Sequence, residues 1–185
     1  MKFCSQCGES VSFRVPTDDN RERFICDSCG VIHYQNPKNV CGVILTRDNK
    51  VLLCRRAIEP RYGLWTLPAG FMENGETVEQ AARREAMEEA NAEAKELKLF
   101  GVFSMPYISQ AYIMFSGELS EAPVSAGIES LEVGLFRQDE IPWDELAFPV
   151  VGESLKLYFE HADSRVHHAH FSRDEQFNHS IHFCK

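Results

Sequence analysis

Apolar and polar residues alternate most regularly in the middle of the chain, where the pattern predicts strands and two helices. Residues 40–56, VCGVILTRDNKVLLCRR, predict a hairpin of two strands around a polar turn. A helix is predicted from Thr77, which can form a capping box with Gln80, to about Ala90. The pattern predicts further strands over 63–71, 95–105, 110–119 and 130–136, a turn or short helix over 139–146, and a closing helix over 150–162. Mixed strands with two flanking helices indicate an α/β/α layered domain.

Three regions separate along the 185 residues, a length that suits one ordinary domain with a small appendage. Residues 1–36 are rich in cysteine and end in the turn signal of YQNPK. Residues 37–160 carry the α/β pattern. Residues 161–185 form a histidine-rich tail that holds six of the seven histidines. We therefore expect a small N-terminal unit, one α/β domain and a tail.

Charge and composition narrow the classes of function. The net charge is −9 at pH 7, whereas nucleic-acid affinity comes largely from clustered Lys and Arg, so we expect no nucleic-acid partner. No apolar run is long enough to span a bilayer, and the N-terminus MKFCSQCGES lacks the apolar core of a signal peptide. We expect a cytoplasmic protein with no membrane partner.

Four of the seven cysteines form two Cys-x-x-Cys pairs. Cys4 and Cys7 make the first pair, Cys26 and Cys29 make the second, and eighteen residues lie between the pairs. This spacing is typical of a tetrahedral Cys4 zinc site, which is closed and therefore structural. Redox-active or incidental thiols are the alternative. We expect a structural Zn²⁺ that holds residues 1–36 together, because so short a segment buries too little apolar surface to fold without such a link.

Acidic residues are unusually dense in the predicted helix. Glu85, Glu88 and Glu89 have i, i+3 and i+4 spacing, so their carboxylates lie on one helix face. Unpaired, they would repel one another, and a hard divalent cation such as Mg²⁺ removes that conflict. A solvated helix face is the ordinary alternative, because adjacent glutamates are common on surface helices.

The residues around these glutamates match the Nudix signature, G-x5-E-x7-R-E-U-x-E-E-x-G-U, where U is an aliphatic residue. The fixed positions fall on Gly70, Glu76, Arg84, Glu85, Glu88 and Glu89, with Ala86 and Ala92 at the aliphatic places. Asn91 stands where the family has glycine. Asn tolerates left-handed backbone better than other non-glycine residues, so we expect the helix to end there in the same way.

The chain thus resembles the Nudix hydrolases with an N-terminal zinc ribbon, over nearly its whole length. The resemblance is greatest to plant-type FAD pyrophosphatases and bacterial ADP-ribose pyrophosphatases. It rests on the signature and on FCSQCG, ICDSCG, YQNPK, GLWTLPAGF and GIESLEVGLFRQDEIPWDELAF. It implies an α/β fold, the Nudix α/β/α sandwich with a mixed sheet, preceded by a small zinc ribbon.

The resemblance also implies roles for particular residues. The family hydrolyses the pyrophosphate of nucleoside diphosphate derivatives with Mg²⁺ or Mn²⁺, which clamp phosphate oxygens and activate water. It implies metal ligation by Glu85, Glu88, Glu89 and the Gly70 carbonyl, with a supporting ion pair between Arg84 and Glu76. The general base varies in the family. Glu85 and Glu129 are candidates here, and Glu132 is a weaker one.

Substrate binding is less marked in the sequence. Phe71, Tyr107 and Tyr112 are candidates to stack on a base or flavin, and Arg55 or Arg56 to reach phosphate. Core packing and ordinary surface exposure are the alternatives for each. NADH pyrophosphatases carry an S-Q-P-W-P-F-P-x-S array after the signature, and this chain has SMPYISQAY and LAFPVV instead. We therefore expect FAD or ADP-ribose, with FAD slightly ahead, and keep NADH as an alternative.

Three further expectations concern the tail, the partners and the alternative class. The histidines of the tail suggest a second metal site, but packing on a partner subunit or over the substrate cleft is the favoured reading. A homodimer is expected from the resemblance only. A Nudix domain that senses a nucleotide ligand without cleaving it is the non-enzymatic alternative, which the complete set of signature glutamates disfavours.

Overall fold

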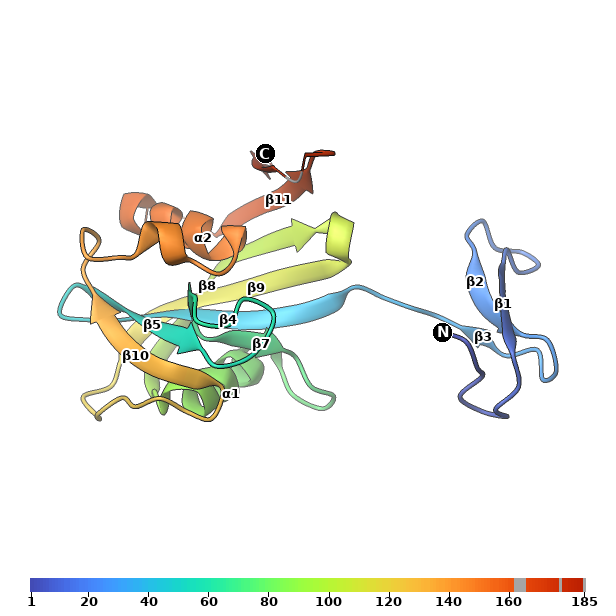
Figure 1. The fold of residues 1–185 in the computed structure, drawn as a ribbon, viewed down its shortest axis with the longest axis horizontal. Helices are drawn as coiled ribbons and strands as arrows, with labels where there is room; N and C mark the ends of the chain where they lie inside the picture. The colour runs from blue at the N-terminus through green and yellow to red at the C-terminus, as the bar shows by residue number, and fades with distance from the viewer. Residues whose placement is uncertain (162–165, 177, 185) are drawn as a thin grey trace. The chain divides into compact units, whose positions relative to one another are not determined.

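The computed structural model describes residues 1–161, 166–176 and 178–184. The chain divides into two compact units, Met1–Pro37 and Lys38–Lys185 (Figure 1). No helix in the described part of the chain combines the length and apolarity that crossing a bilayer requires. The expected cytoplasmic location and homodimer stay predictions.

The first unit is a small antiparallel sheet that carries two cysteine turns. Its strands are β1 (Val11–Arg14), β2 (Arg23–Cys26) and β3 (Ile32–His33), in the order β1-β2-β3. The apolar side chains that it buries are few: Cys4, Pro16, Ile25 and Cys26. Such a small core cannot offset the conformational entropy of about 37 ordered residues by itself, which fits the expected metal link.

The described residues of the second unit form a nine-stranded mixed sheet. Its main strand order is β10-β5-β4-β9-β8-β11-β12, with β6 beside β5 and β7 beside β4. The pairs β4–β9 and β8–β11 are parallel, and the other pairs are antiparallel. The strands are β4 (Lys38–Arg47), β5 (Lys50–Arg56), β6 (Trp65–Thr66), β7 (Ala69–Phe71), β8 (Ala94–Met105), β9 (Gln110–Leu119), β10 (Ser130–Phe136), β11 (His167–Arg173) and β12 (His179–Phe183).

The helices α1 (Val78–Ala90) and α2 (Pro149–His161) cover opposite faces of this sheet (Figure 1). Two 3-10 turns, η1 (Pro106–Ile108) and η2 (Trp143–Glu145), lie between the longer elements. Alternate residues of β4 point to opposite faces, because side chains alternate along a strand. Val43 and Leu45 pack in the core with the alanines of α1, whereas Ile44 packs in the core with Leu155 of α2. The expected layered α/β fold with a mixed sheet is confirmed.

Most predicted elements are present within a residue or two of their expected bounds. The predicted strand 63–71 is the main exception among them. It is divided into β6 and β7 because Pro68 has no N–H for a sheet ladder, although its carbonyl accepts a hydrogen bond from Val43 N at 3.0 Å. The predicted end of the second helix at Ala162 lies outside the described residues.

The histidine-rich segment contributes β11 and β12 to the main sheet, which the sequence reading did not anticipate. The available sequence signal was the alternation of polar and apolar residues from His168 to Phe171, which the structure shows as alternating exposure and burial in a strand. Residues 162–165, 177 and 185 of the predicted tail lie outside the described residues. The division into regions 1–36, 37–160 and 161–185 stays a prediction.

The ends of α1 follow the expected capping chemistry. Thr77 and Gln80 form the complete capping box at the N-terminus. At the C-terminus, Asn91 takes left-handed backbone with φ of 47° and ψ of 36°, and its N–H bonds to the Met87 carbonyl. The Asn91 side chain also donates to the Ser125 carbonyl at 3.1 Å. The residue therefore ends the helix and ties the following loop to it.

We predict that Asn91→Gly leaves the free energy of unfolding within about 1 kcal/mol of wild type. Glycine adopts left-handed backbone freely, and this offsets the loss of the side-chain hydrogen bond to Ser125. Asn91→Ala should cost more, by about 1–2 kcal/mol, because alanine is strained in that conformation. Urea unfolding of both variants would measure this. An Asn91→Ala variant as stable as Asn91→Gly would show that the left-handed conformation is not what the position requires.

Candidate metal centre and substrate hollow

Small side chains let α1 lie close against the sheet. The buried face of the helix is formed by alanines that are fully inaccessible to solvent: Ala81, Ala82, Ala86 and Ala90. Two glutamates of the same helix are drawn into the interface, so Glu85 is only 8% exposed and Glu89 only 5%. The side chain of Glu88 remains 57% exposed. The helix thus carries two carboxylates into a region that usually excludes charge.

Gly70 makes room for the first of these carboxylates. Gly70 lies in β7, which pairs with β4, and the carboxyl group of Glu85 occupies the space where a side chain at position 70 would be. Next to it, the N–H of Ala69 donates to Glu89 Oε2 at 3.3 Å. The backbone of β7 therefore lies against both buried carboxylates.

Arg84 links the acidic groups from the other side. Its guanidinium binds both oxygens of Glu76, at 2.8 and 3.1 Å, and contacts Glu85 at 2.6 Å and Glu88 at 2.9 Å. It also donates to the Phe71 carbonyl at 3.0 Å. The expected ion pair with Glu76 is present, and the hydrogen bonds from Arg84 lower the pKa of Glu76. Arg84 fixes the carboxylates relative to the strand that bears Gly70.

Burial disfavours the ionised form of the two inner carboxylates, Glu85 and Glu89. Burial and the nearby charge of Glu85 raise the pKa of Glu89 to about 8, against the Ala69 N–H bond that lowers it. Burial also raises the pKa of Glu85, while Arg84 lowers it. The charge of Glu129 contributes to raising both values. This electrostatic conflict is what a bound cation would relieve.

Glu129 is brought to this cluster by a loop bound to the end of α1. Ser125 N donates to the Ala90 carbonyl and Gly127 N to the Glu89 carbonyl, both at 3.0 Å. Gly127 lies so close to the Glu88 carbonyl that the backbone leaves no space for a side chain. Two residues later, the exposed Glu129 is near enough to Glu85 and Glu89 for its charge to raise the pKa of both.

The structure separates the other candidates near this loop. Glu132 forms an ion pair with Arg55 at 2.9 Å, and Arg55 also donates to the Gly63 carbonyl. Each of these two side chains therefore has its charged partner outside the carboxylate cluster. Arg56 is buried and donates to the Pro60 carbonyl at 2.9 Å. Burial raises the pKa values of Glu89 and Tyr112, and the charge of Arg56 partly offsets that rise. Of the two arginines, Arg56 is the one that faces the cluster.

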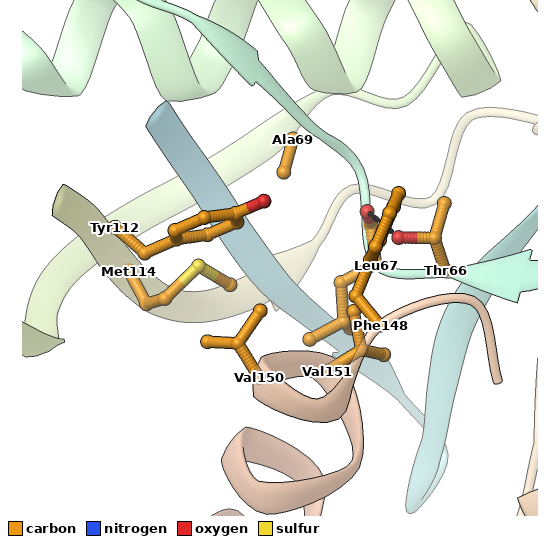
Figure 2. A pocket seen from close by; sticks show the side chains of 8 residues that line it. All are labelled: Thr66, Leu67, Ala69, Tyr112, Met114, Phe148, Val150 and Val151. Carbon is orange, nitrogen blue, oxygen red and sulfur yellow. Dashed lines mark hydrogen bonds between the residues drawn. The ribbon is translucent and has the colours of Figure 1, made fainter. Parts of the chain in front are cut away.

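A small hollow opens beside the cluster on the side of the sheet that α2 covers. It is lined by Thr66, Leu67, Ala69, Tyr112, Met114, Phe148, Val150 and Val151 (Figure 2). Tyr112 and Met114 of β9 lie on one side, and Thr66, Leu67 and Phe148 lie on the other. Ala69 joins the hollow to the carboxylates because its N–H binds Glu89. Its lining is mostly apolar, with one phenol, which is the kind of surface against which a flat ring packs.

The remaining candidates for substrate binding, Tyr107 and Phe71, differ in the side chains that contact them. The ring of Tyr107 lies against Arg173, 5.0 Å from the guanidinium carbon, and against His179 with 5.5 Å between ring centroids. Phe71 is 45% exposed, and the ammonium of Lys38 lies 4.7 Å from its ring centroid. Lys38 and Phe148 were not anticipated from the sequence. The lysine of YQNPK was the available signal, but its position beside Phe71 depends on the β4–β7 pairing.

The four paired cysteines converge in the first unit. Their sulfur atoms all lie within 4.8 Å of one another. Gly8 and Gly30 follow the pairs with φ of 79° and 72°, so each chain turn closes, and their N–H groups bond to the carbonyls of Cys4 and Cys26 at 3.0 Å. The Cys29 N–H bond to sulfur is the leading cause that lowers the pKa of Cys26 to about 7. These thiols fit a tetrahedral thiophilic ion.

Within the described residues, these cysteines are the one set of three or more ligating groups already gathered that tightly. The glutamate cluster is looser because Arg84 holds the Glu88 carboxylate. Its donor set of carboxylate and carbonyl oxygens nevertheless fits a hard divalent ion, and the buried, mutually repelling Glu85 and Glu89 support that fit. The roles of all these residues stay predictions.

Two protein families match this chain, one in its cysteine-rich N-terminal segment and one in the larger region that follows. Residues 2–35 match the Nudix N-terminal zinc-ribbon family, and residues 35–155 match the NUDIX domain family. A crystal structure of a NUDIX hydrolase from Nitrosomonas europaea superposes with a TM-score of 0.87 and 52% sequence identity, covering 92% of this chain and 98% of that one.

Curated relatives include the NAD-capped RNA hydrolase NudC of Vibrio atlanticus, 34% identical over 118 residues, which are 63% of this chain and 40% of that protein. NudC of Yersinia pestis is 29% identical over 171 residues, which are 88% of this chain and 62% of that protein. The chain thus spans about half the length of the curated relatives it matches. The family match over residues 35–155 covers well over half of the sequence, and the chain therefore belongs to the Nudix hydrolase family, with a zinc-ribbon segment ahead of the NUDIX domain.

Proposed function

We propose that this chain is a divalent-metal-dependent hydrolase that cleaves the pyrophosphate of a nucleoside diphosphate derivative. The observation that carries the proposal is the cluster of Glu85, Glu88 and Glu89 around Gly70, held by Arg84. Without a bound cation, burying Glu85 and Glu89 side by side destabilises the folded protein. Such an arrangement is expected where the charges serve a reaction. Mg²⁺ or Mn²⁺ fits the oxygen donors there, and Zn²⁺ fits the cysteines of the first unit.

In the proposed mechanism, the glutamates and the Gly70 carbonyl hold the cation. When bound, the cation neutralises phosphate oxygens and lowers the pKa of a coordinated water. Arg84 orients Glu85 and Glu88 through its hydrogen bonds, so their oxygens keep a fixed direction relative to β7. Arg56, buried beside Glu89, supplies positive charge on the side of the hollow, where a phosphate would enter.

Glu129 is the proposed general base. Its charge acts on both buried carboxylates, it comes from a loop and not from the helix, and in this proposal it would accept a proton from the attacking water. Glu132 is less suited because Arg55 binds it directly. Glu85 is less suited because Arg84 and the proposed cation both use its oxygens.

FAD and ADP-ribose are the proposed substrates, with FMN plus AMP or ribose 5-phosphate plus AMP as the products. Support comes from the resemblance in the first unit and in GIESLEVGLFRQDEIPWDELAF, and from SMPYISQAY and LAFPVV in place of the array of NADH pyrophosphatases. The rings of Tyr112 and Phe148 and the apolar lining of the hollow support a flat ring as the group that packs there.

Substrates that contain NAD are the second candidate. The observation that favours them is that curated relatives at 29–34% identity are named NAD-capped RNA hydrolases. All these molecules share an adenosine diphosphate half, so one site can be tested on all of them. Because these relatives are named for an RNA substrate, the expectation that this chain has no nucleic-acid partner stays a prediction.

The first prediction is that the wild-type chain with Mg²⁺ or Mn²⁺ releases AMP from FAD or ADP-ribose faster than from NADH, NAD, NAD-capped RNA or diadenosine polyphosphates. Glu89→Gln should lower turnover at least about a thousandfold, because the lost charge is worth several kcal/mol to a metal-assisted reaction. Glu79→Gln on the solvent face of the same helix is the matched control. Binding of these ligands without product from the wild type would instead favour a sensor.

The second prediction separates the two loop glutamates. Glu129→Gln should lower kcat by about 10²–10⁴, because general base catalysis contributes that much, while KM changes little. Glu132→Gln should keep kcat near wild type. Steady-state kinetics across pH would measure both, since loss of the base also removes the acidic limb of the kcat profile. Equal losses in the two variants would place the base elsewhere.

The third prediction concerns the stability of the protein without Mg²⁺ or Mn²⁺. The pKa of Glu89 is about 8 in the folded chain and about 4.3 in an unfolded one. Between these values the unfolded chain has released the proton that the folded chain keeps, so stability falls as pH rises through this window and levels off above it.

Glu89→Gln should therefore leave stability near wild type at about pH 4 and raise it by on the order of a few kcal/mol at about pH 9. Thermal unfolding in Mg²⁺-free buffer would measure this, with Glu79→Gln as control. Adding Mg²⁺ should raise the melting temperature of the wild type and not of Glu89→Gln. A variant that melts below wild type at the higher pH would contradict the electrostatic conflict.

A further inference from the structure

The C-terminal hairpin carries histidines on one exposed face. β11 and β12 are antiparallel, with His170 opposite His182 in the register. Along β11 the side chains of Ala169 and Phe171 are buried in the core that includes α2, while His168 and His170 are exposed. Because side chains alternate along a strand, the exposed histidines all point to the face opposite that core.

A thiol completes the set on the same face. The Cys184 N–H donates to the His168 carbonyl at 2.9 Å, one step beyond the pair of Ala169 with Phe183. Cys184 therefore lies across from His168 and is exposed. Three imidazoles and one thiol thus occupy two successive cross-strand positions of the hairpin: His168, His170, His182 and Cys184.

Their geometry is suited to a transition-metal ion. The rings of His170 and His182 are stacked, with 4.9 Å between centroids and 19° between planes. Residues two apart on a strand lie about 6–7 Å apart and cross-strand neighbours about 5 Å, so their ring nitrogens can reach one ion by rotation about side-chain bonds alone. The hydroxyl of Ser172 lies 2.8 Å from His182 Nε2 and orients that ring, as the hydrogen-bond partners of metal-bound histidines do.

We propose that His168, His170, His182 and Cys184 form a surface zinc site, separate from the cysteines of the first unit and from the glutamates of α1. Imidazole and thiolate are the donors that Zn²⁺ prefers, whereas Mg²⁺ prefers oxygen. The donors are not yet gathered as tightly as the ribbon cysteines, so binding replaces the ring stack with shared ligation. A bound ion would link β11 to β12 at the edge of the sheet.

The test is a calorimetric titration of Zn²⁺ into the full chain, after the four ribbon cysteines have been saturated with zinc, in the presence of excess Mg²⁺. The comparison is with a His170→Gln/His182→Gln double variant. Both positions are exposed, so the fold should survive the change. Any zinc taken by the glutamates appears in both titrations and cancels from the difference. His179→Gln is the matched control, because His179 lies on the same strand and pairs with Arg173 on the other face.

We expect one additional zinc per chain in wild type and in His179→Gln, and its loss in the double variant. Cys184→Ser should bind the ion at least about tenfold more weakly, because a good ligand is lost. Zinc should also slow hydrogen exchange in residues 179–184 of the wild type. A wild type that takes no zinc beyond its ribbon, a double variant that binds like wild type, or an equal loss in His179→Gln would overturn the proposal.

Discussion

The rest of the NUDIX domain depends on two carboxylates that are buried side by side, those of Glu85 and Glu89. Helix α1 can bring them to the sheet only because its inner face is made of alanine and because β7 offers Gly70 in front of Glu85. Arg84 then keeps the acidic groups in one orientation. Larger side chains on the inner face would push the helix outward and return both carboxylates to solvent, where they would be ordinary surface charges.

The sequence was most informative where local chemistry decides the structure. The capping box of Thr77 and Gln80, the left-handed Asn91 and the two cysteine turns depend on a few neighbouring residues, and all are present as expected. The pairing of Arg84 with Glu76 is nearly as local. These features explain why the layered fold and the composition of the cluster could be predicted from the sequence.

Features that depend on distant pairings were harder to predict. The contact of Arg55 with Glu132, and the position of Arg56 near Glu89, follow from the register between β10 and β5. Lys38 lies beside Phe71 because β4 pairs with β7. The histidine-rich segment became part of the sheet because its buried alternate residues fill the core under α2, whereas the count of histidines drew attention to their chemistry instead.

The hollow and the carboxylate cluster draw on different parts of the fold. Tyr112 comes from β9, Phe148 directly precedes α2 and Val150 lies in α2, whereas the acidic groups come from α1 on the other side of the sheet. Ala69 is where the two meet. For enzyme engineering, this arrangement means that libraries confined to the hollow can explore new leaving groups while the ionic half of the site stays constant, so substrate range and chemical power can be altered one at a time.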